Sequence, residues 1–62
     1  MQKFICSKII MPDSSYYTLA DQITVTVKLI EGSSLHEDWR RIKAALEKVI
    51  GQPVQNFTFR WA

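Results

Sequence analysis

The chain has 62 residues, of which 47% are hydrophobic and 23% charged, a composition too apolar for a disordered segment. It contains no run of about 18 apolar residues, the length needed to span a bilayer. Eight basic and six acidic residues give a formal net charge of +2, far below that of a strongly basic nucleic-acid-binding protein. We expect a single small domain over residues 1–62. We also expect it to be cytoplasmic, because the N-terminus lacks the pattern of a secretory signal.

Side chains that carry chemistry are few in this chain. Cys6 is the only cysteine, which excludes an internal disulfide and leaves a zinc site with one thiol, one imidazole and carboxylates. Nothing in their spacing brings Cys6 and His36 together as a nucleophile and base, and two glycines cannot make a phosphate-binding loop. We therefore predict that the protein is not an enzyme and that it uses no cofactor and no metal.

Three stretches of the chain show the composition of β-strands. Residues 3–11 are rich in β-branched side chains and end at Pro12, which cannot continue a ladder. Residues 22–31 alternate apolar and polar side chains, and residues 56–61 do so again. The connection over residues 12–21 is rich in turn residues and is long for a hairpin loop, which is typical of functional loops.

A helix is predicted between Ser34 and Gly51. Ser34 and Glu37 form a capping box at its start, while Gly51 supplies a left-handed residue at its end and Pro53 prevents continuation. Apolar residues recur at spacings of four and three, and a stripe of this kind is expected to be buried. Its members are Leu35, Trp39, Ile42, Leu46 and Val49, with Ile50 at the margin.

The element order ββαβ predicts an α+β fold, a three-stranded sheet with one helix packed on one face. Because the helix carries the chain back along the sheet, the third strand should run parallel to the second. Both would then flank the first strand in the order 2-1-3, which places the most apolar strand in the middle. The alternative is a right-handed crossover that pairs the third strand directly with the second, and the connection length permits this as well.

The orientation of the first strand decides what the open face of the sheet carries. If Phe4 and Cys6 pointed at the helix, regular alternation would bury Lys8 among them, and an unpaired buried ammonium group is costly. We therefore expect Ile5, Ile9 and Met11 to point inward. The residues expected on the open face are Phe4, Cys6, Lys8, Ile10, Thr24, Thr26, Lys28, Ile30, Asn56, Thr58 and Arg60.

An open face that is half apolar predicts a binding surface. Our first hypothesis is a small non-enzymatic protein-interaction module, namely an adaptor, inhibitor or self-associating subunit, that uses this face or a strand edge. Its partner is then another protein or a second copy, and no membrane is involved. The alternative is a weak nucleic-acid-binding or regulatory protein that uses the same face, since Phe4 offers a stacking ring beside cations. The residues expected to contact the partner are Phe4, Lys8, Ile10, Lys28, Ile30 and Arg60, together with Tyr16 and Tyr17 of the long loop.

The two tyrosines of the long loop have two interpretations. Tyr16 and Tyr17 either form a recognition tip, because tyrosine combines a large contact area with a polar end, or fold back over an edge of the small core. The sequence favours neither interpretation.

The run Leu29-Ile30-Glu31-Gly32-Ser33-Ser34, the helix after it and the run Gly51-Gln52-Pro53-Val54 resemble the strand-helix-strand unit of small tautomerases related to 4-oxalocrotonate tautomerase. The resemblance covers about half of the chain and implies a tautomerase-like enzyme as a third hypothesis. That family's catalytic base is an N-terminal proline that begins its first strand. Here Met1 opens the chain and Pro12 is internal, so no catalytic residue carries over.

Overall fold

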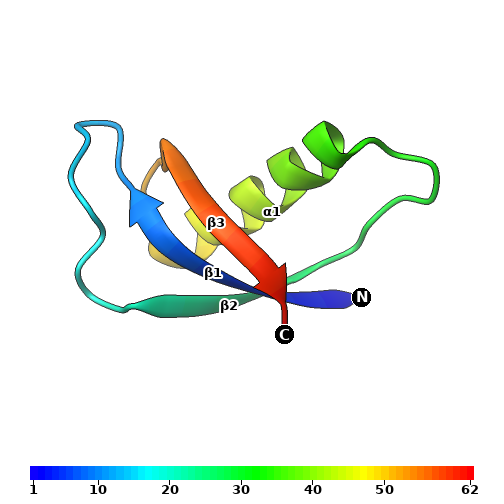
Figure 1. The fold of residues 1–62 in the computed structure, drawn as a ribbon, viewed down its shortest axis with the longest axis horizontal. Coiled ribbons are helices and arrows are strands. Elements are labelled where there is room, and N and C mark those ends of the chain that lie inside the picture. Colours follow the sequence, from blue (N-terminus) through cyan, green and yellow to red (C-terminus); the bar gives the residue numbers. More distant parts are fainter.

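The computed structural model describes residues 1–62 and shows a three-stranded sheet with one helix across one of its faces (Figure 1). The elements in chain order are β1 (Gln2–Ile10), β2 (Gln22–Val27), α1 (Leu35–Ile50) and β3 (Asn56–Trp61). The strands lie in the order β2-β1-β3, and β1 is antiparallel to both neighbours. The predicted α+β class, the ββαβ order and the central position of the first strand are therefore confirmed.

β2 is shorter than the alternation over residues 22–31 predicts. Its last residue, Val27, pairs with Gln2, the first residue of β1, so the chain beyond Val27 has no strand to bond to. A strand without a partner loses its ladder hydrogen bonds. Residues 28–34 consequently form the connection to α1 rather than more of the sheet.

The long connection between β1 and β2 begins with a tight turn at residues 11–15. Ser14 donates its N–H to the Met11 carbonyl at 2.9 Å, and the Asp13 carboxylate accepts from both the hydroxyl and the N–H of Ser15. These two hydrogen bonds lower the pKa of Asp13. The returning chain stays beside β1 as far as Tyr17, which donates its N–H to the Ile9 carbonyl at 2.9 Å.

The helix begins and ends where the sequence predicts. The Ser34 hydroxyl accepts the Glu37 N–H at 3.2 Å, and Gly51 adopts φ 78° while donating to the Glu47 carbonyl at 2.7 Å. α1 is neither long enough nor apolar enough to cross a membrane.

The expectation that the whole apolar stripe of α1 is buried is wrong at both ends. Ile42 and Leu46 are buried in the core, but Leu35 is 74% exposed and Val49 is 61% exposed. In Figure 1 the helix runs at an angle to β1 and β3, and its first turns, which carry Leu35, lie away from the strands. At the other end Ile50 packs against the core, whereas Val49 beside it faces solvent. Trp39, on the turn before Ile42, packs against the edge of the core.

The central strand buries two sets of residues that regular alternation would place on opposite faces. Phe4 and Cys6 are buried near its start, and Ile9 is buried near its end, followed by Met11. Lys8 between them has φ 50°, and the register with β3 shifts between Ser7 and Ile10, which marks a β-bulge.

The bulge corrects the predicted orientation of the first strand. Ile9 and Met11 point inward as expected, whereas Phe4 and Cys6 also point inward, and Ile5 points to the open face. With unbroken alternation, an exposed Lys8 would require Phe4 and Cys6 to face outward as well. The extra residue lets the strand change phase at Lys8, so the lysine stays exposed while both apolar sets face the helix.

The left-handed backbone at Lys8 yields a testable prediction. Lys8→Gly should raise the free energy of unfolding by up to about 1 kcal/mol, since glycine has no Cβ to strain at φ 50°, although its freer unfolded chain offsets part of the gain. Lys8→Val should lower it by about 1–2 kcal/mol, because a β-branched side chain tolerates this conformation poorly. Urea denaturation followed by tryptophan fluorescence measures both. Equal stabilities for the two variants would show that the bulge does not hold this residue left-handed.

Candidate functional site

The face of the sheet away from α1, called the outer face below, is polar. At its centre Ile5 of β1 lies between Thr24 of β2 and Arg60 of β3. Ser7 is the next residue of β1 on this face after Ile5, and its hydroxyl is hydrogen-bonded to that of Thr58 in β3 at 2.9 Å. The expectation of a half-apolar outer face is wrong, because Phe4 and Cys6 belong to the core. Ile5 and the half-buried Ile10 are the apolar residues that the strands leave on it.

The charge on the outer face has one sign. Lys3 and Arg60 lie on it, Lys28 follows the end of β2, and none of the three strands contains an aspartate or glutamate. The six acidic residues all lie in α1 or in the connections. The outer face is therefore a small field of hydroxyls and cations without a carboxylate.

On the opposite, helix-facing side of the sheet, five rings form a continuous series called the aromatic row. Trp39 stacks on Phe57 at 5.3 Å between ring centroids, and Phe57 lies 6.1 Å from Phe59. Phe59 meets Phe4 edge to face at 5.7 Å, and Phe4 lies 4.7 Å from Trp61. The row therefore runs from the helix, through the core, to the last residue of β3.

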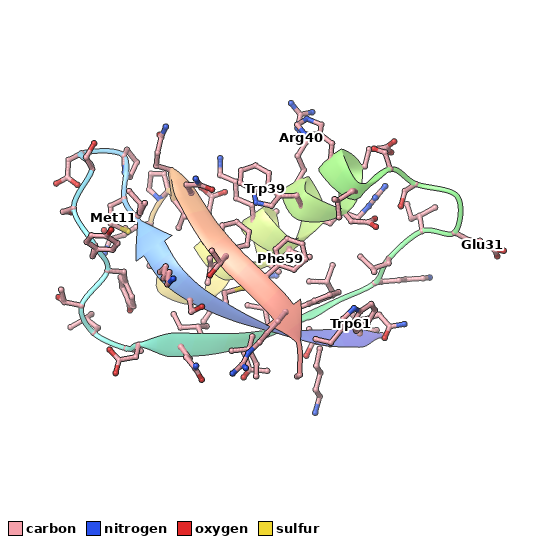
Figure 2. The ribbon with its side chains drawn as sticks, in the orientation of Figure 1. Met11, Glu31, Trp39, Arg40, Phe59 and Trp61 are labelled. Atoms are coloured by element: carbon pink, nitrogen blue, oxygen red, sulfur yellow. The ribbon has the colours of Figure 1, made fainter.

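The aromatic row becomes exposed towards its end. Phe57 and Phe4 are buried and Phe59 is half-buried, whereas Trp61 is 63% exposed and projects beside the end of β3 (Figure 2). Among the three strands, α1 packs most closely against β2, on the far side of β1 from β3. The C-terminal half of β3 consequently lacks the cover that the helix gives to β2.

β3 is an edge strand, and its outer edge carries unpaired backbone groups. Ala62 donates its N–H to the Lys3 carbonyl at 3.1 Å, so by the alternation of an antiparallel ladder Arg60 and Thr58 also bond to β1. The N–H and C=O groups of Phe59 and Trp61 therefore point to the free edge. At the start of the strand, the Phe57 N–H is already accepted by the Asn56 side chain at 2.9 Å.

The structure disperses the residues expected to contact a partner. The prediction that Phe4 contacts a partner is wrong, because Phe4 is only 2% exposed and the bulge at Lys8 allows its ring to lie in the core while the lysine stays exposed. Ile30 is exposed but lies in the connection to α1, several residues beyond the end of β2. The remaining predicted residues lie at three places. Lys28 and Arg60 are exposed near the two edges of the sheet, whereas Lys8, Ile10, Tyr16 and Tyr17 gather at the end of β1.

The two tyrosines take different positions. Tyr17 packs against the core, while Tyr16 is exposed and bridges to Ile10. Both line a hollow of about 600 Å³ where the chain of residues 18–21 bows away from the bulge of β1. Lys8 and Asp21 also line this hollow, yet they form no ion pair.

Trp61 is the functional candidate that sequence reasoning missed. Its alternation with Phe57 and Phe59 indicates an inward direction, and the structure shows Trp61 on the helix-facing side of the sheet but largely exposed. The available signal was its position at the last residue of an edge strand, where a short helix provides no cover.

Cys6 and the acidic residues form no reactive cluster. Burial raises the pKa of the Cys6 thiol to about 11, so it is protonated at neutral pH and a poor nucleophile. No group of three or more histidine, cysteine, aspartate or glutamate side chains is placed to hold a metal ion.

Comparison with models of known protein families, with characterised proteins and with solved structures finds no match to this chain. Two of the surfaces described above have chemistry suited to binding: the free edge of β3 with the exposed end of the aromatic row, and the cationic outer face.

Proposed function

We propose that this protein is a non-enzymatic protein-interaction module that binds an extended segment of a partner along the free edge of β3. The observation that carries the proposal is the 63% exposure of Trp61 next to unpaired backbone groups of the same strand. Strand addition of this kind takes its affinity from backbone hydrogen bonds and its specificity from alternate side chains.

The chemistry of β3 suits such a partner. The backbone groups that point to the free edge belong to Phe59 and Trp61, the same residues whose rings lie on the helix-facing side. An added strand with apolar residues at alternate positions would bond to those groups and cover both rings together. Tryptophan is among the residues that contribute most at protein interfaces.

The outer face supports a second candidate function, weak nucleic-acid binding. Lys3, Lys28 and Arg60 lie among hydroxyl side chains with no carboxylate on the strands, and lysine, arginine, serine and threonine are the side chains that contact phosphates. No aromatic ring lies on that face to stack with a base, since Phe4 is in the core. Binding there would be of the salt-dependent, sequence-independent kind.

Affinity capture from native lysate, with and without nuclease, tests the two functions together. We expect Trp61→Ser to weaken capture of the partner roughly 30-fold or more, because truncation of a central tryptophan costs about 2 kcal/mol or more. Lys3→Ala, Lys28→Ala and Arg60→Ala together should chiefly slow association and flatten its salt dependence. Nuclease treatment of the lysate should leave the amount of captured partner unchanged.

Leu35→Ser is the matched control for this capture, because Leu35 is more exposed than Trp61 and lies on α1, away from the edge of β3. It should capture the partner as the wild type does. Circular dichroism on each variant confirms that it is folded. Capture that survives Trp61→Ser but disappears with nuclease or with the triple alanine variant would reject strand addition and favour the nucleic-acid function.

A further inference from the structure

Resting on the proposed function of the β3 edge, we infer that its partner is a second copy of this chain. The two β3 strands pair antiparallel about a two-fold axis at Phe59, which joins the two sheets into one. Phe59 then lies opposite Phe59 of the partner subunit. The inference follows from three features of β3: the backbone N–H and C=O groups at its free edge, the alternation of its side chains between the two faces, and the position of Arg60.

The backbone of β3 is self-complementary about Phe59. Its free N–H and C=O groups belong to alternate residues, Phe59 and Trp61, because Thr58 and Arg60 bond inward to β1. Antiparallel pairing about Phe59 lets each Phe59 exchange two hydrogen bonds with the partner's Phe59. It also places each Trp61 N–H at the carbonyl of the partner's Phe57. The Phe57 N–H does not need a partner, because the Asn56 side chain already accepts it at 2.9 Å.

Side-chain parity requires the two-fold axis to pass through a residue, and the three central residues of β3 that could carry it with good overlap are Thr58, Phe59 and Arg60. Residues directly opposite each other point to the same face, so odd residues must pair with odd residues to keep the rings together. An axis at Arg60 would set two guanidinium groups opposite each other, which is destabilising. An axis at Thr58 would leave Trp61 beyond the start of the partner strand at Asn56. An axis at Phe59 sets Trp61 against the partner's Phe57 and Arg60 against the partner's Thr58.

The β3 edge gains more from such pairing than the β2 edge. The inward residues Val25 and Val27 are already buried under α1, so pairing at β2 would remove little further apolar surface from water. At β3 the half-buried Phe59 would be covered by the partner's Phe59, and the largely exposed Trp61 would pack beside the partner's Phe57. Aromatic pairs add to the stabilisation beyond the area that they bury.

Sedimentation equilibrium on charge variants at position 58 tests the register. Thr58→Glu should tighten the dimer about two- to thirtyfold, because it places a carboxylate opposite each Arg60, while Thr58→Lys should weaken it by a similar factor. Both variants lose the same hydroxyl bonds to Ser7, so the loss of those bonds cannot account for a difference between them. Thr24→Glu is the control, since Thr24 is an exposed outer-face residue on β2 with no role at the β3 edge. The Thr24→Glu control should leave the dissociation constant of the dimer unchanged. At 0.5 M salt the Debye length is about 4 Å, so screening should reduce the difference in dimer affinity between the position-58 variants.

Hydrogen exchange at rising protein concentration provides a second measurement. The Phe59 and Trp61 amides should become protected as the dimer forms, whereas the Thr24 and Thr26 amides on the free edge of β2 should remain fast. A wild type that stays monomeric at about 1 mM would overturn the inference. So would equal shifts from Thr58→Glu and Thr24→Glu, or a shift of the same sign from both variants at position 58.

The two proposals fail separately in these experiments. If the protein is monomeric but Trp61→Ser abolishes capture, strand addition stands and the second copy is the wrong partner. If the dimer responds to charge as predicted but capture of another protein is unaffected by Trp61→Ser, the β3 edge serves self-association alone.

Discussion

Phe4→Ala should lower the free energy of unfolding by about 3–5 kcal/mol, which is the usual cost of truncating a buried phenylalanine. The Phe4 side chain is 2% exposed and holds two rings of β3, with Phe59 at 5.7 Å and Trp61 at 4.7 Å between centroids. The truncation leaves a cavity beneath these two rings. Neither ring can move in to fill it unless β3 also moves, because β3 pairs residue by residue with β1. Urea denaturation monitored by circular dichroism measures the loss.

Ile5→Ala is the control for the orientation of β1. Ile5 is the next residue along the strand, half-buried on the outer face between Thr24 and Arg60. Its truncation should cost about 1 kcal/mol, because half of the lost surface is already in water. A larger loss at Ile5 than at Phe4 would mean that β1 has no bulge and presents the opposite face to the helix.

Leu46→Ala should lower the free energy of unfolding by about 2–5 kcal/mol. The Leu46 side chain is fully buried beside Ile42 at the centre of the helix contact with the sheet. A domain of this size has a total stability of about 3–9 kcal/mol, so the variant should be largely unfolded in mild denaturant at 25 °C. Thermal and urea denaturation provide the comparison with the wild type.

Val49→Ala serves as the control for Leu46→Ala. Val49 belongs to the predicted apolar stripe of α1, yet it is 61% exposed. Its truncation should change the stability by less than about 0.5 kcal/mol, since alanine also has the higher helix propensity. Equal losses at the two sites would show that α1 is rotated about its axis relative to the sheet.

The core and the proposed binding edge are linked through Phe4. The Phe4 ring packs against the Trp61 ring, and the hydrogen bond from the Ala62 N–H to the Lys3 carbonyl holds the backbone of the residue that follows Trp61. Trp61 is therefore held both by a ring contact with the core and by the backbone ladder of the sheet. A rigid aromatic residue loses little conformational entropy on binding, which favours its use as an anchor.

Local chemistry in the sequence determined the helix and the element order. The Ser34–Glu37 capping box and the left-handed Gly51 act within one turn of the chain, so their effect does not depend on what packs nearby. The topology followed from similarly simple constraints. A helix that returns the chain along the sheet sets the direction of β3, and burial of the most apolar strand sets the order β2-β1-β3.

Only the tertiary structure decided which side chains are covered. The bulge at Lys8 reverses the phase of half of β1, and nothing in the local sequence around that lysine distinguishes a bulge from continued alternation. The exposure of Leu35, Val49 and Trp61 likewise depends on where α1 crosses the sheet. Periodicity gives the direction of a side chain, but its burial depends on residues far away in the sequence that pack over it. For that reason the exposed aromatic surface lies at the edge of β3 rather than on the outer face.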